Sequence, residues 1–124
     1  MKHIKYPKTY HLPFSQTVKS DDKIVTDFSN FENKEIVITE KLDGENTSLY
    51  SDGHHARSLD SRHNWTRDWL AGWYPSISYM IPDDIIVNIE YMYAKHSIEY
   101  KELDSYVYMI NMCEKRSDGV YVSS

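Results

Sequence analysis

The chain alternates between short β-prone runs and turn residues, and this alternation restricts its fold more than any other feature. Runs of β-branched, aromatic and other apolar residues are typical of strands, especially where Gly, Pro, Asp or Asn bounds them. Such runs predict strands at residues 35–40, 46–50, 54–58, 85–92, 106–112 and 119–122. Asp52-Gly53 is the strongest turn signal, because Asp-Gly favours the two-residue turns of β-hairpins. We therefore predict a hairpin between the second and third of these runs.

One segment has a helical period instead. Its three tryptophans are spaced four residues apart: Trp65, Trp69 and Trp73. This spacing predicts a helix with the indoles along one face, and we expect all three to anchor the core. Ser61 or Asn64 would cap the helix, and Pro75 would interrupt or end it. Residues 1–31 show no sustained period and predict an extended arm with a turn. The fold class that follows is α+β, a mixed, largely antiparallel sheet with one or two packed helices.

Composition excludes several classes of protein. A chain of 124 residues fits one domain, and its net charge of −5 argues against nucleic-acid binding by bulk positive charge, so such a role needs a local site. The single cysteine, Cys113, allows neither an intrachain disulfide nor a thiolate metal site, and the histidines lack zinc-site spacing. No apolar run approaches the ~20 residues that span a membrane. We expect a cytoplasmic monomer with no membrane partner.

The segment 40–46 is the strongest candidate for chemistry. Lys41 ends a β-prone run, and Asp43-Gly44 follows at once as a turn. A nucleophilic lysine must be neutral although its ordinary pKa is about 10.4, and partial burial or neighbouring cations lower that pKa. Gly44 lets backbone and ligand approach closely because it has no side chain. An ordinary β-turn is the structural alternative for this pattern.

The string Lys41-Leu42-Asp43-Gly44 resembles motif I of the covalent nucleotidyltransferases, which comprise ATP-dependent DNA and RNA ligases and mRNA capping enzymes. Its extension to Asn46 is more similar to RNA ligases. Later segments resemble, in order, the arginine motif, motif III and the aromatic motif IIIa of one subgroup of phage and bacterial RNA ligases: residues 55–63, 88–98 and 105–111. Thr9–Pro13 also resembles that subgroup. The resemblance covers nearly the whole chain and implies a nucleotidyltransferase-like fold.

The resemblance also implies a mechanism. Lys41 would attack the α-phosphorus of ATP and become a lysyl–AMP phosphoramidate. The AMP would pass to an RNA 5′-phosphate, and a 3′-hydroxyl would then displace it and seal the strand. Mg²⁺ would bridge the phosphates, with few direct protein ligands and no dedicated metal residues.

The same resemblance assigns nucleotide-binding residues. Glu40 would read the adenine edge, with Leu42 beside the lysine, and Asn46 matches an asparagine associated with sealing. Glu90 matches the motif III glutamate that contacts the ribose. Phosphate or ribose would be held by Arg57 or Arg62, and we favour Arg57 for the nucleotide.

Three departures from the family pattern stand out. The aromatic residue expected to stack on adenine falls at Val107, so Tyr106 or Tyr108 would replace it, and we assign Tyr108. Asn88 stands near a position where the family commonly has glycine. The basic motif V and the acidic strand of motif IV do not follow, which predicts that residues 1–124 are the N-terminal portion of an adenylyltransferase domain with weak or no ligation of its own.

Two other functions stay open at this level. A non-catalytic nucleotide- or RNA-binding remnant of the same fold would bind ATP without forming a covalent adenylate. A DNA ligase or capping-type enzyme would share motif I, although the strings around Arg57 and at 94–98 are more similar to RNA ligases.

Overall fold

A computed structural model describes residues 2–16, 18–20, 22–59, 64–93 and 102–123. The chain divides into two compact units, residues 7–41 and residues 1–6 with 42–124. We describe each by itself.

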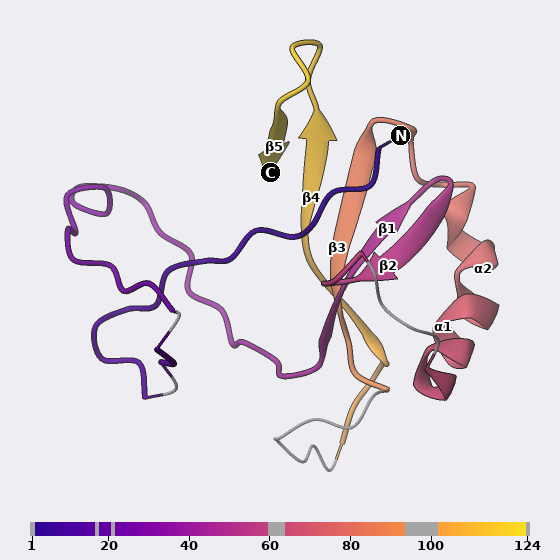
Figure 1. The fold of residues 1–124 in the computed structure, drawn as a ribbon, viewed down its shortest axis with the longest axis horizontal. Helices are drawn as coiled ribbons and strands as arrows, with labels where there is room; N and C mark the ends of the chain where they lie inside the picture. The colour runs from indigo at the N-terminus through magenta and orange to yellow at the C-terminus, as the bar shows by residue number, and fades with distance from the viewer. Residues whose placement is uncertain (1, 17, 21, 60–63, 94–101, 124) are drawn as a thin grey trace. The chain divides into compact units, whose positions relative to one another are not determined.

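The larger unit is an antiparallel sheet of five strands (Figure 1). Its strands are β1 (Glu45–Tyr50), β2 (Gly53–Ala56), β3 (Ile85–Tyr91), β4 (Val107–Lys115) and β5 (Tyr121–Ser123), in the order β2-β1-β3-β4-β5. The predicted hairpin is confirmed: Tyr50 pairs with Gly53 across a turn at Ser51-Asp52, and Gly53 is the first residue of β2. A register shift between Asn88 and Ile89 places one extra residue on β4, a β-bulge.

The predicted helical segment is confirmed, in three short pieces. The 3₁₀ turn Trp65–Arg67 (η1) leads into α1 (Asp68–Trp73), and Pro75 begins a new helix, α2 (Pro75–Ser78). The Asn64 side chain accepts the backbone N–H of Thr66, so it caps the start as predicted; Ser61, the other candidate cap, lies outside the described residues. Among those residues no helix is long and apolar enough to cross a membrane. The fold class, α+β with a largely antiparallel sheet, is confirmed at this level.

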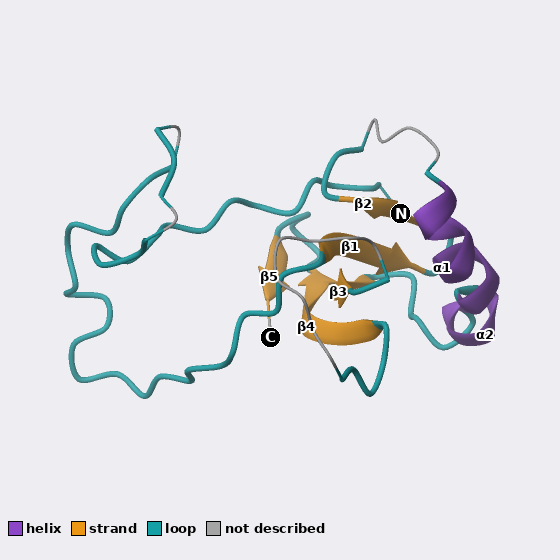
Figure 2. Ribbon diagram, turned by 90° about the horizontal axis from the view of Figure 1, so that it is seen from below, coloured by secondary structure: helices purple, strands orange, loops and turns teal. Residues whose placement is uncertain are grey.

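The core lies between the helices and one face of the sheet. Both helices lie beside β1–β3 and away from β5 (Figures 1 and 2). Leu70 of α1 is buried against Leu49, Ile89 and Tyr91, and Trp69 and Trp73 pack around this cluster. Trp65 differs from the prediction, because its side chain is 69% exposed. The 3₁₀ turn at the helix start breaks the 3.6-residue period, so Trp65 leaves the face that its spacing suggested.

The strand predicted at residues 35–40 is wrong. These residues have no regular structure and are exposed, with Val37 and Ile38 at 87% and 86%. Among the described residues of the 7–41 unit, the one β-bridge joins His11 and Ile24, so this unit contains no sheet edge for the run to join. Among the described residues up to Phe31, the predicted turn is present and no helix or strand forms.

Candidate functional site

Three residues assigned to nucleotide binding lie in one row across the sheet. Asn46 of β1 is the register partner of Glu90 of β3, and Glu90 is the partner of Tyr108 of β4. Register partners in an antiparallel sheet project from the same face. Because Tyr91, the neighbour of Glu90, packs into the core under the helices, this row lies on the opposite face. The sheet therefore gathers three side chains that are up to 62 positions apart in sequence.

The motif I turn at Gly44 is hydrogen-bonded to β3, the strand that carries Glu90. The backbone N–H of Gly44 donates to Glu90 Oε1 over 3.0 Å, and this contact is partly buried. A Cβ on Gly44 would lie 2.5 Å from the carbonyl oxygen of Tyr91 and 2.6 Å from Met92 Sδ. Glycine is required here because the turn lies directly against β3. Glu90 thus orients the motif I turn, in addition to any contact with a ligand.

The side-chain oxygen of Asn46, Oδ1, is the atom of the row that points most directly to a ligand. This atom is buried and accepts no hydrogen bond within the described part of the chain. Leaving a buried acceptor unpaired costs about 1–3 kcal/mol. A donor from a ligand, such as a ribose hydroxyl or an adenine amine, would remove that cost. The residues present therefore fit a nucleotide at this position.

The position expected to stack on adenine, Val107, and its two tyrosine neighbours lie in different places. Val107 packs against the core on the helix side, and Tyr106 packs edge-on against Trp69, 5.2 Å between ring centroids. Tyr108, the residue assigned from the sequence, shares the face of Asn46 and Glu90. Its place on this face follows from the alternation of side chains along β4.

A ladder of side-chain hydrogen bonds supports the row from the next register position. Ser48 Oγ donates to Asn88 Oδ1 at 2.8 Å, and Asn88 Nδ2 donates to Asn111 Oδ1 at 2.8 Å. Asn88 is 3% exposed, so this amide bridges β1, β3 and β4 in a buried setting. The ladder lies beside the bulge of β4, and it fixes the strands where their register changes. The alternating pattern Asn88-Ile89-Glu90 was the signal that could have predicted it.

Residues 3 and 4 lie at the other end of this face, beside Tyr50. The His3 ring stacks on Tyr50 with 4.0 Å between centroids, and the backbone N–H of Ile4 donates to the Tyr50 hydroxyl over 2.9 Å. Burial raises the pKa of Tyr50. His3 also pairs with Asp52 at 2.9 Å, and this hydrogen bond lowers the Asp52 pKa. His3 and Ile4 thus mark one boundary of the candidate site.

Arg67 is a link between η1 and the sheet that the sequence did not indicate, and it lies on the helix side, opposite the row. Its guanidinium pairs with Glu45, donates to Thr47 Oγ1 at 3.0 Å, and lies 5.7 Å from the centroid of the Tyr91 ring. It lies within 3.5 Å of His54, whose pKa is lowered by burial and then by the Arg67 charge. The Arg67 side chain is 13% exposed. Arg67 connects η1 to the start of β1, directly before Asn46.

The remaining predicted residues are not in the row. Glu40 and Lys41 are exposed and end the 7–41 unit, and Lys41 does not end a strand, so that prediction is wrong. Leu42 begins the larger unit and is half-buried. Arg57 is exposed one residue past Ala56, the β2 residue that pairs with Thr47. Arg62 lies outside the described residues, as does the 94–98 string.

Comparison with known proteins yields one positive finding. The chain has no match among curated proteins or among solved structures. The model of the RNA ligase family matches residues 34–124, which include the motif I turn and all five strands. The chain therefore belongs to the RNA ligase family.

Proposed function

We propose that the protein is an ATP-dependent RNA ligase that works through a covalent adenylate on Lys41. The observation that carries this proposal is the row of Asn46, Glu90 and Tyr108, with a buried acceptor on Asn46 that lacks a donor. In a chain of the RNA ligase family, ATP is the nucleotide that such a row would hold.

The chemistry assigned to Lys41 is an in-line displacement at phosphorus. The neutral Nζ attacks the α-phosphorus of ATP, a P–N bond forms, the bond to the pyrophosphate oxygen breaks, and Nζ loses a proton. An RNA 5′-phosphate oxygen then displaces Lys41 from AMP. A 3′-hydroxyl finally attacks that 5′-phosphorus, and AMP leaves as the strand closes. Such steps depend on positioning and on charge stabilisation.

The other residues act on the nucleotide in this proposal. Asn46 would accept a hydrogen bond from it, Tyr108 would stack on the adenine, and Glu90 would hold the Gly44 turn while contacting the ribose. Arg57 would bind phosphate, and Glu40 would read the adenine edge. Mg²⁺ would neutralise charge on the phosphates when bound. We expect its ligands to come chiefly from phosphate and water, as is usual for Mg²⁺ on nucleotides. Among the described residues, no group of three or more acidic, His or Cys side chains could hold a metal ion.

Adenylation is the decisive test. The chain is incubated with α-labelled ATP and Mg²⁺, and covalent label that stays with the denatured protein, survives alkali and is released by acid is measured on wild type, Lys41→Ala and Lys34→Ala. Lys34 is the matched control because it is another exposed lysine of the same unit. We expect label on wild type and Lys34→Ala and none on Lys41→Ala. Label that persists in Lys41→Ala, or no label on wild type, would contradict the proposal.

A second candidate function has one observation in its favour. Lys41 is exposed and lies outside the strands, which suits a nucleotide-binding protein without covalent transfer. That function predicts ATP binding that Asn46→Ala weakens, with no covalent label on the denatured wild-type chain. The adenylation measurement therefore separates the two.

A further inference from the structure

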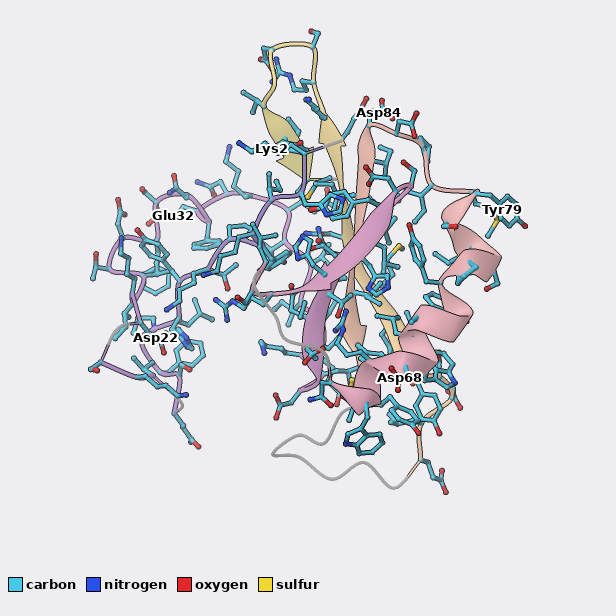
Figure 3. All side chains as sticks on the ribbon, turned by 45° about the vertical axis from the view of Figure 1, so that its right-hand side comes forward. Lys2, Asp22, Glu32, Asp68, Tyr79 and Asp84 are labelled. Carbon is cyan, nitrogen blue, oxygen red and sulfur yellow. The ribbon has the colours of Figure 1, made fainter. Side chains whose placement is uncertain are left out.

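A group of aromatic side chains reaches the surface beside the start of α1. Trp65, Tyr106 and Tyr93 are 69%, 42% and 39% exposed. We call these three residues the aromatic platform. Figure 3 shows aromatic rings gathered around Asp68, the first residue of α1. Aromatic side chains of this size are normally the best anchors of a core, so an exposed set in contact with one another calls for a ligand.

The rings of the platform are held in fixed orientations. Tyr93 lies nearly parallel to Trp69 and to buried Tyr91, with interplanar angles of 12° and 18°. Trp65 and Tyr106 each meet Tyr93 edge-on, at 82° and 87°. Tyr91 is fixed in turn, because its hydroxyl donates to the carbonyl of Thr66. The exposed rings therefore rest on a packed support, which reduces the entropy lost on binding.

We propose that the aromatic platform stacks the unpaired bases of a single-stranded RNA end. The proposal rests on the proposed function in one respect, that an RNA strand is the substrate. Every base has a π-face, so stacking on tyrosine and tryptophan binds single strands with little regard to sequence. The uncovered apolar side chains of the β4–β5 hairpin, Met109, Met112 and Val122, have no ring to offer a base.

Position in the sheet connects the platform to the candidate site. Glu90 of the site row is followed directly by Tyr91, the ring that supports the platform, and Tyr93 is two residues further along. The Gly44 turn approaches Tyr91 and Met92 at the same end of β3. An RNA end stacked on the platform would therefore lie at the end of β3 that carries Glu90, on the opposite face of the sheet from the row of Asn46, Glu90 and Tyr108.

The net charge of −5 favours binding through stacking over binding through phosphate contacts. Proteins that bind nucleic acid through phosphate contacts lose affinity steeply as salt rises. Binding through the platform is expected to depend less on salt and little on base sequence.

The test is fluorescence anisotropy with a short, fluorescein-labelled oligoadenylate, without ATP. Trp65→Ala is expected to weaken binding about tenfold, the loss of one stacked base. Trp65→Phe keeps a ring and is expected to retain most of the affinity. Tyr79→Ala is the matched control, since Tyr79 is an 80% exposed aromatic residue at the end of α2, and we expect wild-type binding. Thermal melting of each variant checks that it folds.

Several results would overturn the proposal. One is that Trp65→Ala binds the oligoadenylate with the same affinity as wild type. Another is that duplex RNA competes as strongly as single-stranded RNA. A third is that the affinities of both proteins fall steeply as salt rises. Self-association that Trp65→Ala abolishes, with no RNA binding, would assign the platform to a second copy of the chain instead. Repeating the titration with Lys41→Ala keeps this result separate from the proposed adenylation, because the platform does not require Lys41.

Discussion

Two runs of this chain have nearly the same β-prone composition, and they differ completely in structure. Residues 85–91, Ile-Ile-Val-Asn-Ile-Glu-Tyr, form the central strand β3, between β1 and β4. Residues 35–40, Glu-Ile-Val-Ile-Thr-Glu, are exposed and irregular. Strand propensity records how well a side chain fits a half-buried sheet, so it is realised only where partner strands exist. β3 has them on both edges, and the 7–41 unit offers none among its described residues.

The contrast bears directly on function, because the site row depends on β3. Glu90 has its place because β3 is paired with β1 and β4, whereas Glu40 ends the run that lacks a partner and Lys41 follows it. The site residues with regular secondary structure are thus those that belong to the sheet.

The largest expected effect compares the same substitution in both runs. Ile89 is 2% exposed, so Ile89→Ala removes core packing and is expected to lower the free energy of unfolding by about 2–5 kcal/mol. Ile38 is 86% exposed, and Ile38→Ala is expected to change it by less than about 0.5 kcal/mol. Urea unfolding measures both. Equal losses would show that residues 35–40 are buried in solution, and the contrast would then be wrong.

The next test concerns the close approach of the motif turn to β3. Gly44→Ala places a methyl group against the Tyr91 carbonyl and is expected to destabilise the protein by about 1–3 kcal/mol. Gly72→Ala is the matched control: a Cβ there meets open space on α1, so it should raise stability by about 0.5–1 kcal/mol. Thermal unfolding of both variants, with ATP binding, checks this. If Gly44→Ala is neutral, the turn is not held against the strand.

A slightly smaller effect is expected from the ladder on β3. Asn88→Ala leaves the Ser48 hydroxyl and the Asn111 amide without their partner, at a cost of about 1–2 kcal/mol. Ser48→Ala combined with Asn88→Ala should cost less than the sum of the two single changes, because the same hydrogen bond is removed twice. A double-mutant cycle in urea measures the coupling. Strict additivity would show that the bond contributes nothing.

The sequence predicted the fold correctly where a strand-forming run also has a partner strand to pair with. The Asp52-Gly53 hairpin, the strands around Ile89 and the Asn64 cap are all visible in the sequence. Residues 35–40 show the limit, because no local pattern reveals whether a partner is present. Trp65 shows a second limit of sequence-based prediction, since a single 3₁₀ turn was enough to expose a residue at helical spacing.

The site was predictable in its residue types but not in its arrangement. Motif resemblance selected Asn46, Glu90 and Tyr108, and the register of β1, β3 and β4 then placed them in one row. Arg67 could not be predicted, because it reaches Glu45 and Thr47 through tertiary packing across 22 and 20 positions. The Asn88 ladder required knowledge of which strands are neighbours.

The smallest expected effect is a pH dependence from His54 of β2, which lies beside Arg67 of η1. Burial and then the Arg67 charge hold the His54 pKa below its ordinary value of 6.5 in the folded protein. The unfolded chain therefore binds a proton at His54 more readily, and stability falls as pH drops from about 7 to 5. His54→Asn should make this part of the unfolding curve shallower. Because Arg67 repels the protonated ring, Arg67→Met should reduce the same slope while lowering stability at pH 7. Unfolding free energies measured across this range on the three proteins check the prediction, and identical slopes would mean that His54 titrates alike in the folded and unfolded chains.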